Sequence, residues 1–167
     1  VTGVQTCALP IYTFTITATA GANGTITPSG TTTVNYGSLQ TYTVTPATGY
    51  HVASLLVDGT PVDGTSFTFS NVVTDHTIAV TFAIDTFTIT ATAGANGTIT
   101  PSGTTTVNYG ASQTYTVTPA TGYHVASLLV DGTTATLTGS TYTFSNVTAN
   151  RTIAVTFAID KIGRAHV

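Results

Sequence analysis

The sequence contains very few charged residues. Only 3 of its 167 residues are Lys or Arg and 6 are Asp or Glu, which gives a formal net charge of −3. A protein that binds the phosphate backbone of nucleic acid needs clustered Lys and Arg side chains. The composition therefore excludes a basic nucleic-acid footprint, and we expect no nucleic-acid partner.

Cysteine, tryptophan and methionine are equally scarce, with one Cys, no Trp and no Met. A single cysteine builds no disulfide framework. No apolar run approaches the ~20 residues that a membrane helix requires, although the mean hydropathy is positive, at +0.32. We therefore expect no membrane span. The polar positions are instead filled by Thr, whose branched side chain suits a half-exposed β surface.

What the chain does contain is an internal repeat. Thr13–Gly37 returns letter for letter as Thr86–Gly110, a shift of 73 (86 − 13). Thr41–Thr60 returns as Thr114–Thr133 at the same shift. Self-similarity at a fixed period is the signature of tandem repeat units. The chain is therefore predicted to hold two copies of one unit.

The two ends of the chain match neither copy. Residues 162–167 can be encoded by a DNA sequence whose reverse complement lies inside one that encodes Gln5–Ile11. Two unrelated protein ends should not be encodable by complementary DNA. Both ends look like translated sequencing adapter, and Cys7 belongs to the first of them. Segments of this kind carry no information about the fold. We therefore expect non-native segments at 1–11 and 161–167, and β-repeat domains at 12–85 and 86–160, joined with almost no linker.

The adapter interpretation also accounts for the residues at the two joins. Tyr12 stands where the second copy has Asp85, and the Tyr and Asp codons differ by one base. Lys161 stands where a further copy would place a Thr. The natural protein is therefore predicted to continue with further copies of the repeat.

Each copy is predicted to be built of about seven short strands and no helix. Tyr12–Ala20 alternates apolar and Thr residues strictly, which is typical of a half-buried strand. Asn23-Gly24 predicts a hairpin turn, since both residues accept positive φ. Tyr50–Val57 lies between turns and is short for a helix, so a kinked strand is predicted. The fold class is therefore all-β, with two tandem small β-sandwich or β-grasp-like domains.

The alternation also predicts a small core in each copy and a variable loop. Thr60–Ser66 is two residues shorter than its counterpart Thr133–Thr141, which marks a surface loop. Tyr36 is expected to point inward with Val34. The predicted core of the first copy is Phe14, Ile16, Ile26, Val34, Tyr42, Val44, Val52, Leu55, Val57, Phe69, Ile78, Val80 and Phe82.

The residues capable of chemistry do not form a recognisable active site. His51 and His76 are candidate metal ligands with Asp58 or Asp75, but the second copy has Arg151 in place of His76 and Asn150 in place of Asp75. A shared metal site would not survive that exchange, so these histidines are interpreted as surface residues. Motifs of hydrolases, phosphate loops and calcium loops are lacking. We expect no enzymatic activity, no cofactor and no metal.

Four tyrosines are the remaining candidate ligand contacts. If they are exposed, they supply aromatic platforms for sugars; the alternative is packing in the core or at a sheet edge. They are Tyr36, Tyr50, Tyr109 and Tyr123.

The spacing of Gly, Pro and aromatic residues resembles a known family. The chain reads F-T-I-T-A-x-x-G-x-x-G-T-I-x-P-x-G, then T-Y-T-V-T-P-x-x-G-Y-x-V, then V-D-G, and ends each copy with T-F-S-N-V-x-x-x-x-T-I-x-V-x-F. This pattern is similar to the divergent internalin B-repeat family over Tyr12–Asp160. The resemblance implies tandem arrays in large bacterial proteins that are secreted or attached to the cell surface and often adhesin-like, without catalytic residues.

Two functions follow from this resemblance. The first is a structural spacer or stalk repeat, which the near-identity of the copies favours. The second is a carbohydrate- or protein-binding accessory module of an exported enzyme or adhesin. The expected partners are further copies of the repeat in the parent chain and a cell-wall or host glycan or protein, and the expected location is extracellular or at the cell surface.

Overall fold

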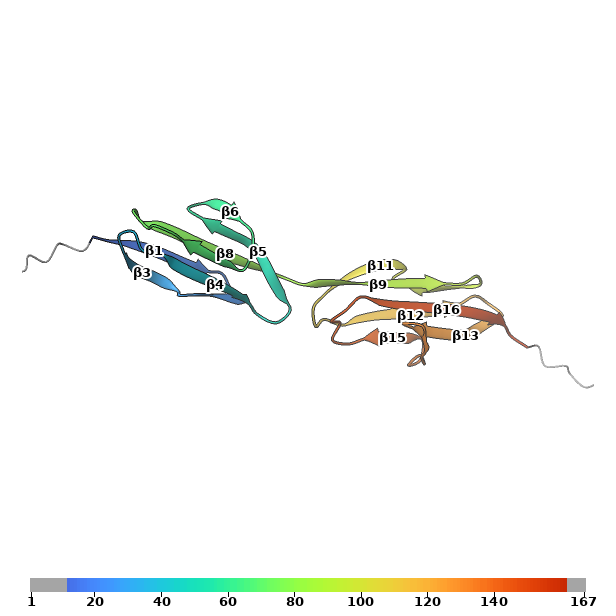
Figure 1. Ribbon diagram of the computed structural model, residues 1–167. Coiled ribbons are helices and arrows are strands. Elements are labelled where there is room, and N and C mark those ends of the chain that lie inside the picture. Colours follow the sequence, from blue (N-terminus) through green and yellow to red (C-terminus); the bar gives the residue numbers. More distant parts are fainter. Residues whose placement is uncertain (1–11, 162–167) are drawn as a thin grey trace, which may run out of the picture. The chain divides into compact units, whose positions relative to one another are not determined.

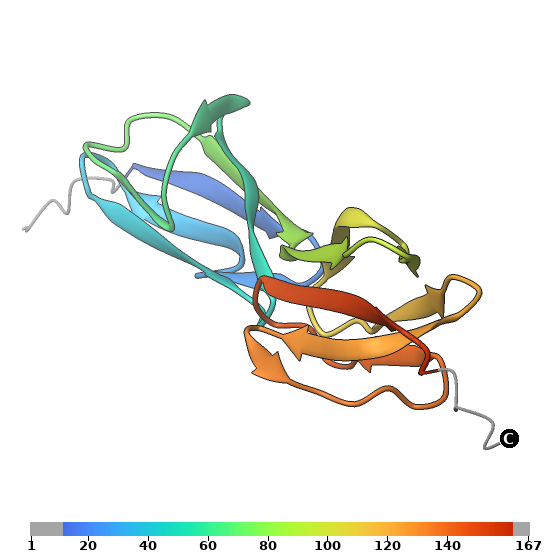
Figure 2. The same cartoon turned by 90° about the vertical axis from the view of Figure 1, so that its right-hand side faces the viewer.

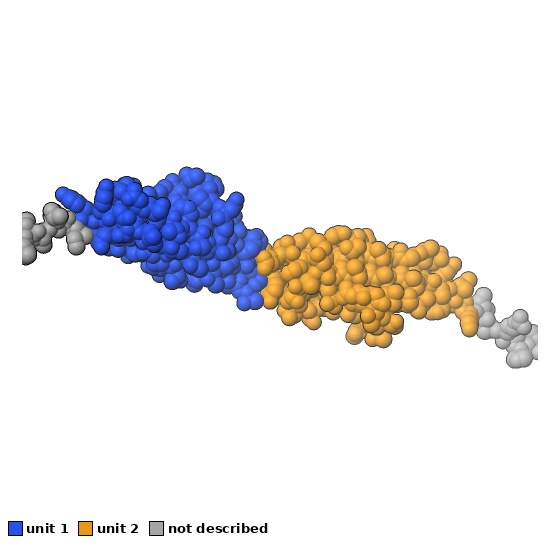
Figure 3. Space-filling view, in the orientation of Figure 1, with its two compact units in different colours: residues 1–83 blue, residues 84–167 orange. Residues whose placement is uncertain are grey.

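A computed structural model describes residues 12–161, so the expected adapter-derived segment at 1–11 lies outside the described residues, as does the one at 161–167 apart from Lys161. The chain forms two compact units that divide between Ala83 and Ile84 (Figure 3). Every regular element in the described part of the chain is a β-strand (Figure 1). The all-β prediction is therefore confirmed. Within residues 12–161 there is no helix long and apolar enough to cross a membrane.

Each unit contains eight strands. Those of unit 1 are β1 (Thr13–Ala20), β2 (Gly24–Thr27), β3 (Gly30–Asn35), β4 (Gln40–Pro46), β5 (Tyr50–Val57), β6 (Thr60–Val62), β7 (Ser66–Phe69) and β8 (His76–Ile84). Those of unit 2 are β9 (Thr86–Ala93), β10 (Gly97–Thr100), β11 (Gly103–Asn108), β12 (Gln113–Pro119), β13 (Tyr123–Val130), β14 (Thr133–Thr134), β15 (Thr141–Phe144) and β16 (Arg151–Ile159).

The eight strands of each unit are divided between two sheets. In unit 1 the larger sheet has the order β3-β1-β8-β5-β6 and the smaller sheet has the order β2-β4-β7. Unit 2 repeats both orders with β11-β9-β16-β13-β14 and β10-β12-β15. Figure 2 shows the same strands from the side. The first and last strands of a unit, β1 and β8, are neighbours and run parallel.

The expectation of about seven strands misses one strand per copy, because the loop that differs in length starts with a short strand. Thr60–Val62 pairs with β5, and Thr133–Thr134 pairs with β13. The kink expected in the GYHVASLLV segment is a register shift between Val125 and Ser127 in the pairing of β13 with β16.

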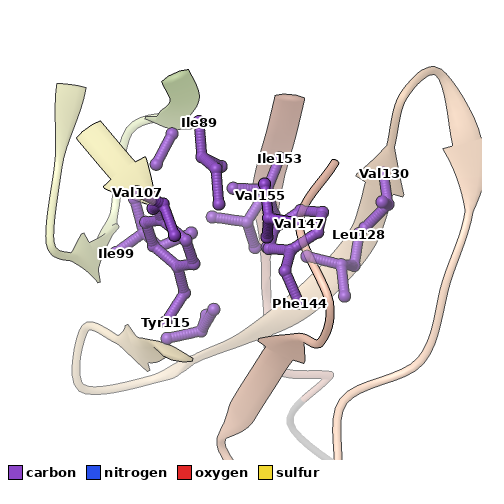
Figure 4. Close-up of a cluster of buried hydrophobic side chains, with 12 residues drawn as sticks. Ile89, Ile99, Val107, Tyr115, Leu128, Val130, Phe144, Val147, Ile153 and Val155 are labelled. Carbon is purple, nitrogen blue, oxygen red and sulfur yellow. The ribbon is translucent and has the colours of Figure 1, made fainter. Parts of the chain in front are cut away.

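The predicted alternation places most of the core side chains correctly. Ile16 and Ala18 are 0% and 3% exposed, while Thr17 and Thr19 between and after them face solvent. Figure 4 shows the corresponding core of unit 2, with side chains from both sheets pointing toward one another. Of the predicted core of unit 1, all residues are buried except Phe14, Val52, Val57 and Phe82, which are half-buried against it.

One inward assignment is wrong, and one core residue is absent from the predicted set. Tyr36 was expected to point inward but is 63% exposed. It follows the last residue of β3, where its N–H donates to the carbonyl of Tyr12 and its ring lies at the margin of Phe14, 6.2 Å between centroids. Past the end of β3, the alternation of inward and outward side chains no longer places a residue against the opposing sheet. Val72, which belongs to no strand, is instead fully buried.

The hairpin predicted at Asn23-Gly24 is also wrong, since β1 and β2 belong to different sheets. Asn23 does have a positive φ of 70°, but Gly24 does not. Glycine is required at position 24 for another reason: a Cβ there would lie 2.2 Å from Cζ of Phe82. The bare backbone allows the phenyl ring to pack directly on the point where the chain passes from one sheet to the other.

Candidate functional site

The most concentrated polar cluster of unit 1 is centred on Asp58, in the turn between β5 and β6. Asp58 has a positive φ of 48°, a conformation that Asp tolerates better than most residues. Its Oδ1 accepts a hydrogen bond of 2.7 Å from the N–H of Thr77, and its Oδ2 lies 2.7 Å from Nδ1 of His76. The carboxylate therefore fastens the turn to the first residues of β8.

Unit 2 builds the same cluster with a different cation. Oδ1 of Asp131 accepts a hydrogen bond of 2.8 Å from the N–H of Thr152, and Nε of Arg151 donates to Oδ2 of Asp131 at 2.8 Å. The exchange of His76 for Arg151 thus preserves a partner for the same carboxylate. Each of these side chains also lies against a buried phenyl ring. The His76 ring is 4.8 Å from the ring of Phe69, and the guanidinium carbon of Arg151 is 5.6 Å from the ring centroid of Phe144.

A second exchange between the copies also preserves its contact. Oδ1 of Asp75 accepts a hydrogen bond of 2.7 Å from the N–H of Thr15, and Oδ1 of Asn150 accepts one of 2.9 Å from the N–H of Thr88. An acid and an amide fill the same place. The position therefore requires a hydrogen-bond acceptor rather than a charge.

The pKa of Asp58 lies below its ordinary value of 3.8. Partial burial acts in the opposite direction and raises the pKa, but it is outweighed by the hydrogen bond from the Thr77 N–H and by the hydrogen bond and positive charge offered by His76. Nearly half of the Asp58 side chain is exposed, at 46%. The carboxylate is thus held in its charged form as a structural acceptor at neutral pH.

Of the candidate metal ligands, His76 and Asp58 meet as a pair, and Asp75 is engaged elsewhere. His76 is paired with Asp58, while Asp75 is turned to the backbone of Thr15. His124 of unit 2 contacts Asp160, with 3.0 Å between Nδ1 and Oδ1, and both side chains are more than half exposed. Over residues 12–161, no three or more His, Cys, Asp or Glu side chains are grouped so as to hold a metal ion.

The four candidate tyrosines are placed at opposite ends of their own unit. Tyr109 donates its N–H to the carbonyl of Asp85, the residue before β9, whereas Tyr123 faces Ile159, the last residue of β16. Tyr36 and Tyr50 occupy the corresponding positions of unit 1. Tyr36 is exposed and the other three are half-buried. The two tyrosines of a unit therefore do not form one aromatic platform, and ligand contact at each remains a prediction.

Unit 2 has two surface hollows of note, and neither resembles a catalytic site. One, of about 160 Å³, lies beside Arg151 and is bordered by Tyr142, Asn146 and Thr148. Its only charged group is already paired with Asp131. The other, of about 340 Å³, lies between β13 and the longer loop of this copy, and its lining includes Val125, Leu128 and Leu137 but no charged residue. Neither hollow brings together a nucleophile and a base.

The sequence brings His76 and Asp58 together only as candidate metal ligands, and it does not predict the ion pair that the structure shows. Both copies retain the Asp of the V-D-G turn, and both carry a residue able to bear positive charge at the start of the last strand. An acid in one turn and a basic residue at the start of the last strand, present in both copies, are the signal for this ion pair.

The model of one protein family matches both units. It is described as the divergent InlB B-repeat domain and matches residues 14–86 and 87–161. No curated protein gives a significant match. A crystal structure of the I9-I11 tandem from titin shows 10% sequence identity and a TM-score of 0.18, over 90% of this chain and 66% of the titin chain, so this chain spans just under two thirds of it. A likeness at that level supports no argument.

Proposed function

The chain belongs to the divergent InlB B-repeat family, and we propose that it is a non-catalytic spacer, or stalk, of a larger bacterial protein that is secreted or held at the cell surface. The two units are tandem copies of one β-sandwich. The family and the Thr-rich composition with few charges support an extracellular location.

The observation that carries the proposal is the route of the chain through each unit. The chain enters unit 1 through β1 and leaves through β8, and these strands are parallel neighbours from Ile16↔His76 to Ala20↔Val80. Tension on the two ends pulls the strands in opposite directions along their common axis, so the hydrogen bonds between them are loaded together rather than one after another. Unit 2 repeats this arrangement, with β9 and β16 paired from Ile89↔Arg151 to Ala93↔Val155.

The substitutions between the copies support the same function. The exchange of His76 for Arg151 keeps the pairing with the turn carboxylate, and the exchange of Asp75 for Asn150 keeps the hydrogen bond to the neighbouring strand. What the copies share is thus the set of contacts that holds the sandwich. A repeated binding site would require the same exposed chemistry in both copies.

The second candidate, a carbohydrate- or protein-binding accessory module, is favoured by one observation. Tyr36 is 63% exposed, and Leu39, three residues later, is 69% exposed. Exposed aromatic rings are suitable for stacking on sugars. Leu39 is replaced by Ser112 in unit 2, however, so this apolar surface belongs to one copy. Polysaccharide binding that is lost in Tyr36→Ala and kept in Tyr109→Ala would favour this function over the spacer.

Single-molecule pulling tests the spacer directly. A protein of residues 12–161, which lacks Cys7, is pulled from its two ends. Each unit is expected to unfold in one step and to release up to about 250 Å of chain, for 73 residues (86 − 13) at about 3.5 Å each. The control attaches the handles to Thr13→Cys and Asn35→Cys, which face each other on antiparallel β1 and β3, so that these strands separate one hydrogen bond at a time. Equal or higher unfolding force in the control would refute the load-bearing role.

A further inference from the structure

The edge of the larger sheet at β3 lacks the features that usually prevent strand-to-strand association. An open sheet edge presents unpaired N–H and C=O groups, and natural proteins protect such edges with charges, proline, bulges or short strands. β3 and its copy β11 both read GTTTVN, without a charge or a proline. Their pairing with β1 and β9 runs over six residues without a register shift.

The opposite edge of the same sheet is protected in both units. In unit 1, β6 is three residues long and carries Pro61, which has no N–H to donate. In unit 2, β14 is only two residues long. The edges of the smaller sheets are strands of four residues. β3 and β11 are therefore the longest edge strands in the described part of the chain.

The register shows which backbone groups point away from the sheet. The N–H of Tyr36 donates to the carbonyl of Tyr12, and antiparallel partners alternate between hydrogen-bonded and non-hydrogen-bonded pairs. Val34 and Thr32 are therefore bonded to β1, while the N–H groups of Thr31, Thr33 and Asn35 are directed outward. The Thr15 N–H, opposite Thr33, bonds to Asp75 on the far side of β1, as this alternation requires.

We propose that this edge is a self-association surface, on which β3 or β11 of one chain pairs antiparallel with the same strand of a second copy. A two-fold axis at Thr33 sets Thr33 opposite Thr33 and Thr31 opposite Asn35. It forms roughly four backbone hydrogen bonds that do not use the Asn35 carbonyl, which already accepts a hydrogen bond from the N–H of Ser38. An antiparallel pairing of identical strands about a two-fold axis is self-complementary. This surface is independent of the spacer function.

The side chains of the edge favour an identical strand over a foreign peptide. The exposed face of the paired strands would present Thr and Asn only, so no like charges oppose each other. The protein already pairs Thr hydroxyls across strands, with 2.8 Å between Oγ1 of Thr41 and Oγ1 of Thr68, and again between Thr114 and Thr143. Peptide-binding edges gain specificity from pockets beside the edge. The two hollows of unit 2 described above are lined by residues of other elements.

Sedimentation velocity on the whole chain, from about 10 μM to about 1 mM, tests this proposal, since the upper limit detects association with a Kd of about 1 mM. The unmodified chain is expected to self-associate as its concentration rises. Thr33→Lys alone leaves one open edge and is expected to form nothing larger than a dimer. Thr33→Lys with Thr106→Lys closes both edges and is expected to weaken association at least about tenfold.

The matched control places the same charges on the inner strands of the same sheets. Thr17 and Thr90 are exposed on β1 and β9, away from the edge, so Thr17→Lys with Thr90→Lys is expected to leave association within about twofold of the unmodified chain. A chain that stays monomeric at about 1 mM overturns the proposal, as do equal effects of the edge and control variants, or oligomers larger than dimers in Thr33→Lys.

Hydrogen exchange on the unmodified chain gives a second reading that needs no variant. The amides of Thr31, Thr33 and Asn35, with those of Thr104, Thr106 and Asn108, are expected to gain protection as concentration rises. Unchanged exchange at these amides across an association step would place the contact elsewhere and overturn the proposal.

Discussion

Replacing Gly24 by Ala tests the packing of Phe82 against the backbone at the crossing from β1 to β2. A Cβ at Gly24 would lie 2.2 Å from Cζ of Phe82 and 2.4 Å from both Cε atoms. The ring would have to move by roughly 1.5 Å to restore an ordinary carbon contact of about 3.7 Å. Gly24 does not have a positive φ, so backbone strain adds nothing to this effect.

The expected cost is that of overpacking a core, about 1–3 kcal/mol. For a domain of this size, that lowers the melting temperature of unit 1 by roughly 5 to 20 °C. The signals of unit 2 in the same sample serve as an internal reference when unfolding is followed by NMR. Gly97→Ala is expected to produce the same loss in unit 2, where the Cβ would lie 2.3 Å from Cζ of Phe157.

Gly21→Ala is the matched control. A Cβ at Gly21 meets the carbonyl oxygen of Val80 at 3.6 Å, an ordinary contact, and Gly21 also lacks a positive φ. This substitution is expected to be neutral or slightly stabilising. Phe82→Leu in the Gly24→Ala background should recover part of the loss, which a double-mutant cycle measures. If Gly24→Ala is as harmless as Gly21→Ala, the packing explanation is refuted.

Three further outcomes follow from the two units. Tyr42→Phe is expected to stabilise unit 1 by about 1 kcal/mol in urea unfolding, because the buried Tyr42 hydroxyl has no hydrogen-bond partner among the described residues. A loss of stability would show that this hydroxyl does form a hydrogen bond. The folded-state pKa of Asp58 is lowered, so its contribution to stability is present above its ordinary value of 3.8 and is lost as the pH falls through the folded-state pKa. Asp58→Asn should therefore flatten the stability of unit 1 at acidic pH, and an unchanged pH profile would contradict the role of this carboxylate. Calorimetric titration with zinc or calcium is expected to show no binding; stoichiometric binding would contradict the structural interpretation of His76.

The strands could be predicted from the sequence because Thr occupies nearly every outward position. Thr17 between Ile16 and Ala18 defines two faces without reference to any other part of the chain. The alternation does not say which sheet a strand joins, since a strand in either sheet has one buried face. That is why Asn23-Gly24 was interpreted as a hairpin, although the chain changes sheets there.

The polar cluster could be predicted only in part, for a related reason. Comparing the copies at His76 and Arg151 argues against a shared metal ligand. It does not reveal that both side chains meet the same turn carboxylate, because the partners are 18 residues apart in unit 1 (76 − 58) and are brought together by the β5–β8 pairing. The exposure of Tyr36 depends likewise on where the opposing sheet ends.

The central claim is that each repeat is a self-sufficient module, and the most direct test is to measure the unfolding free energy of residues 86–161 expressed alone. The core of unit 2 is formed entirely by its own side chains, from Ile89 to Val155. We expect a cooperative urea transition whose free energy agrees with that of unit 2 in the whole chain within about 0.5 kcal/mol. A chain of residues 86–161 that stays unfolded, or that is far less stable than the same unit beside its neighbour, would contradict this claim and indicate a coupled array.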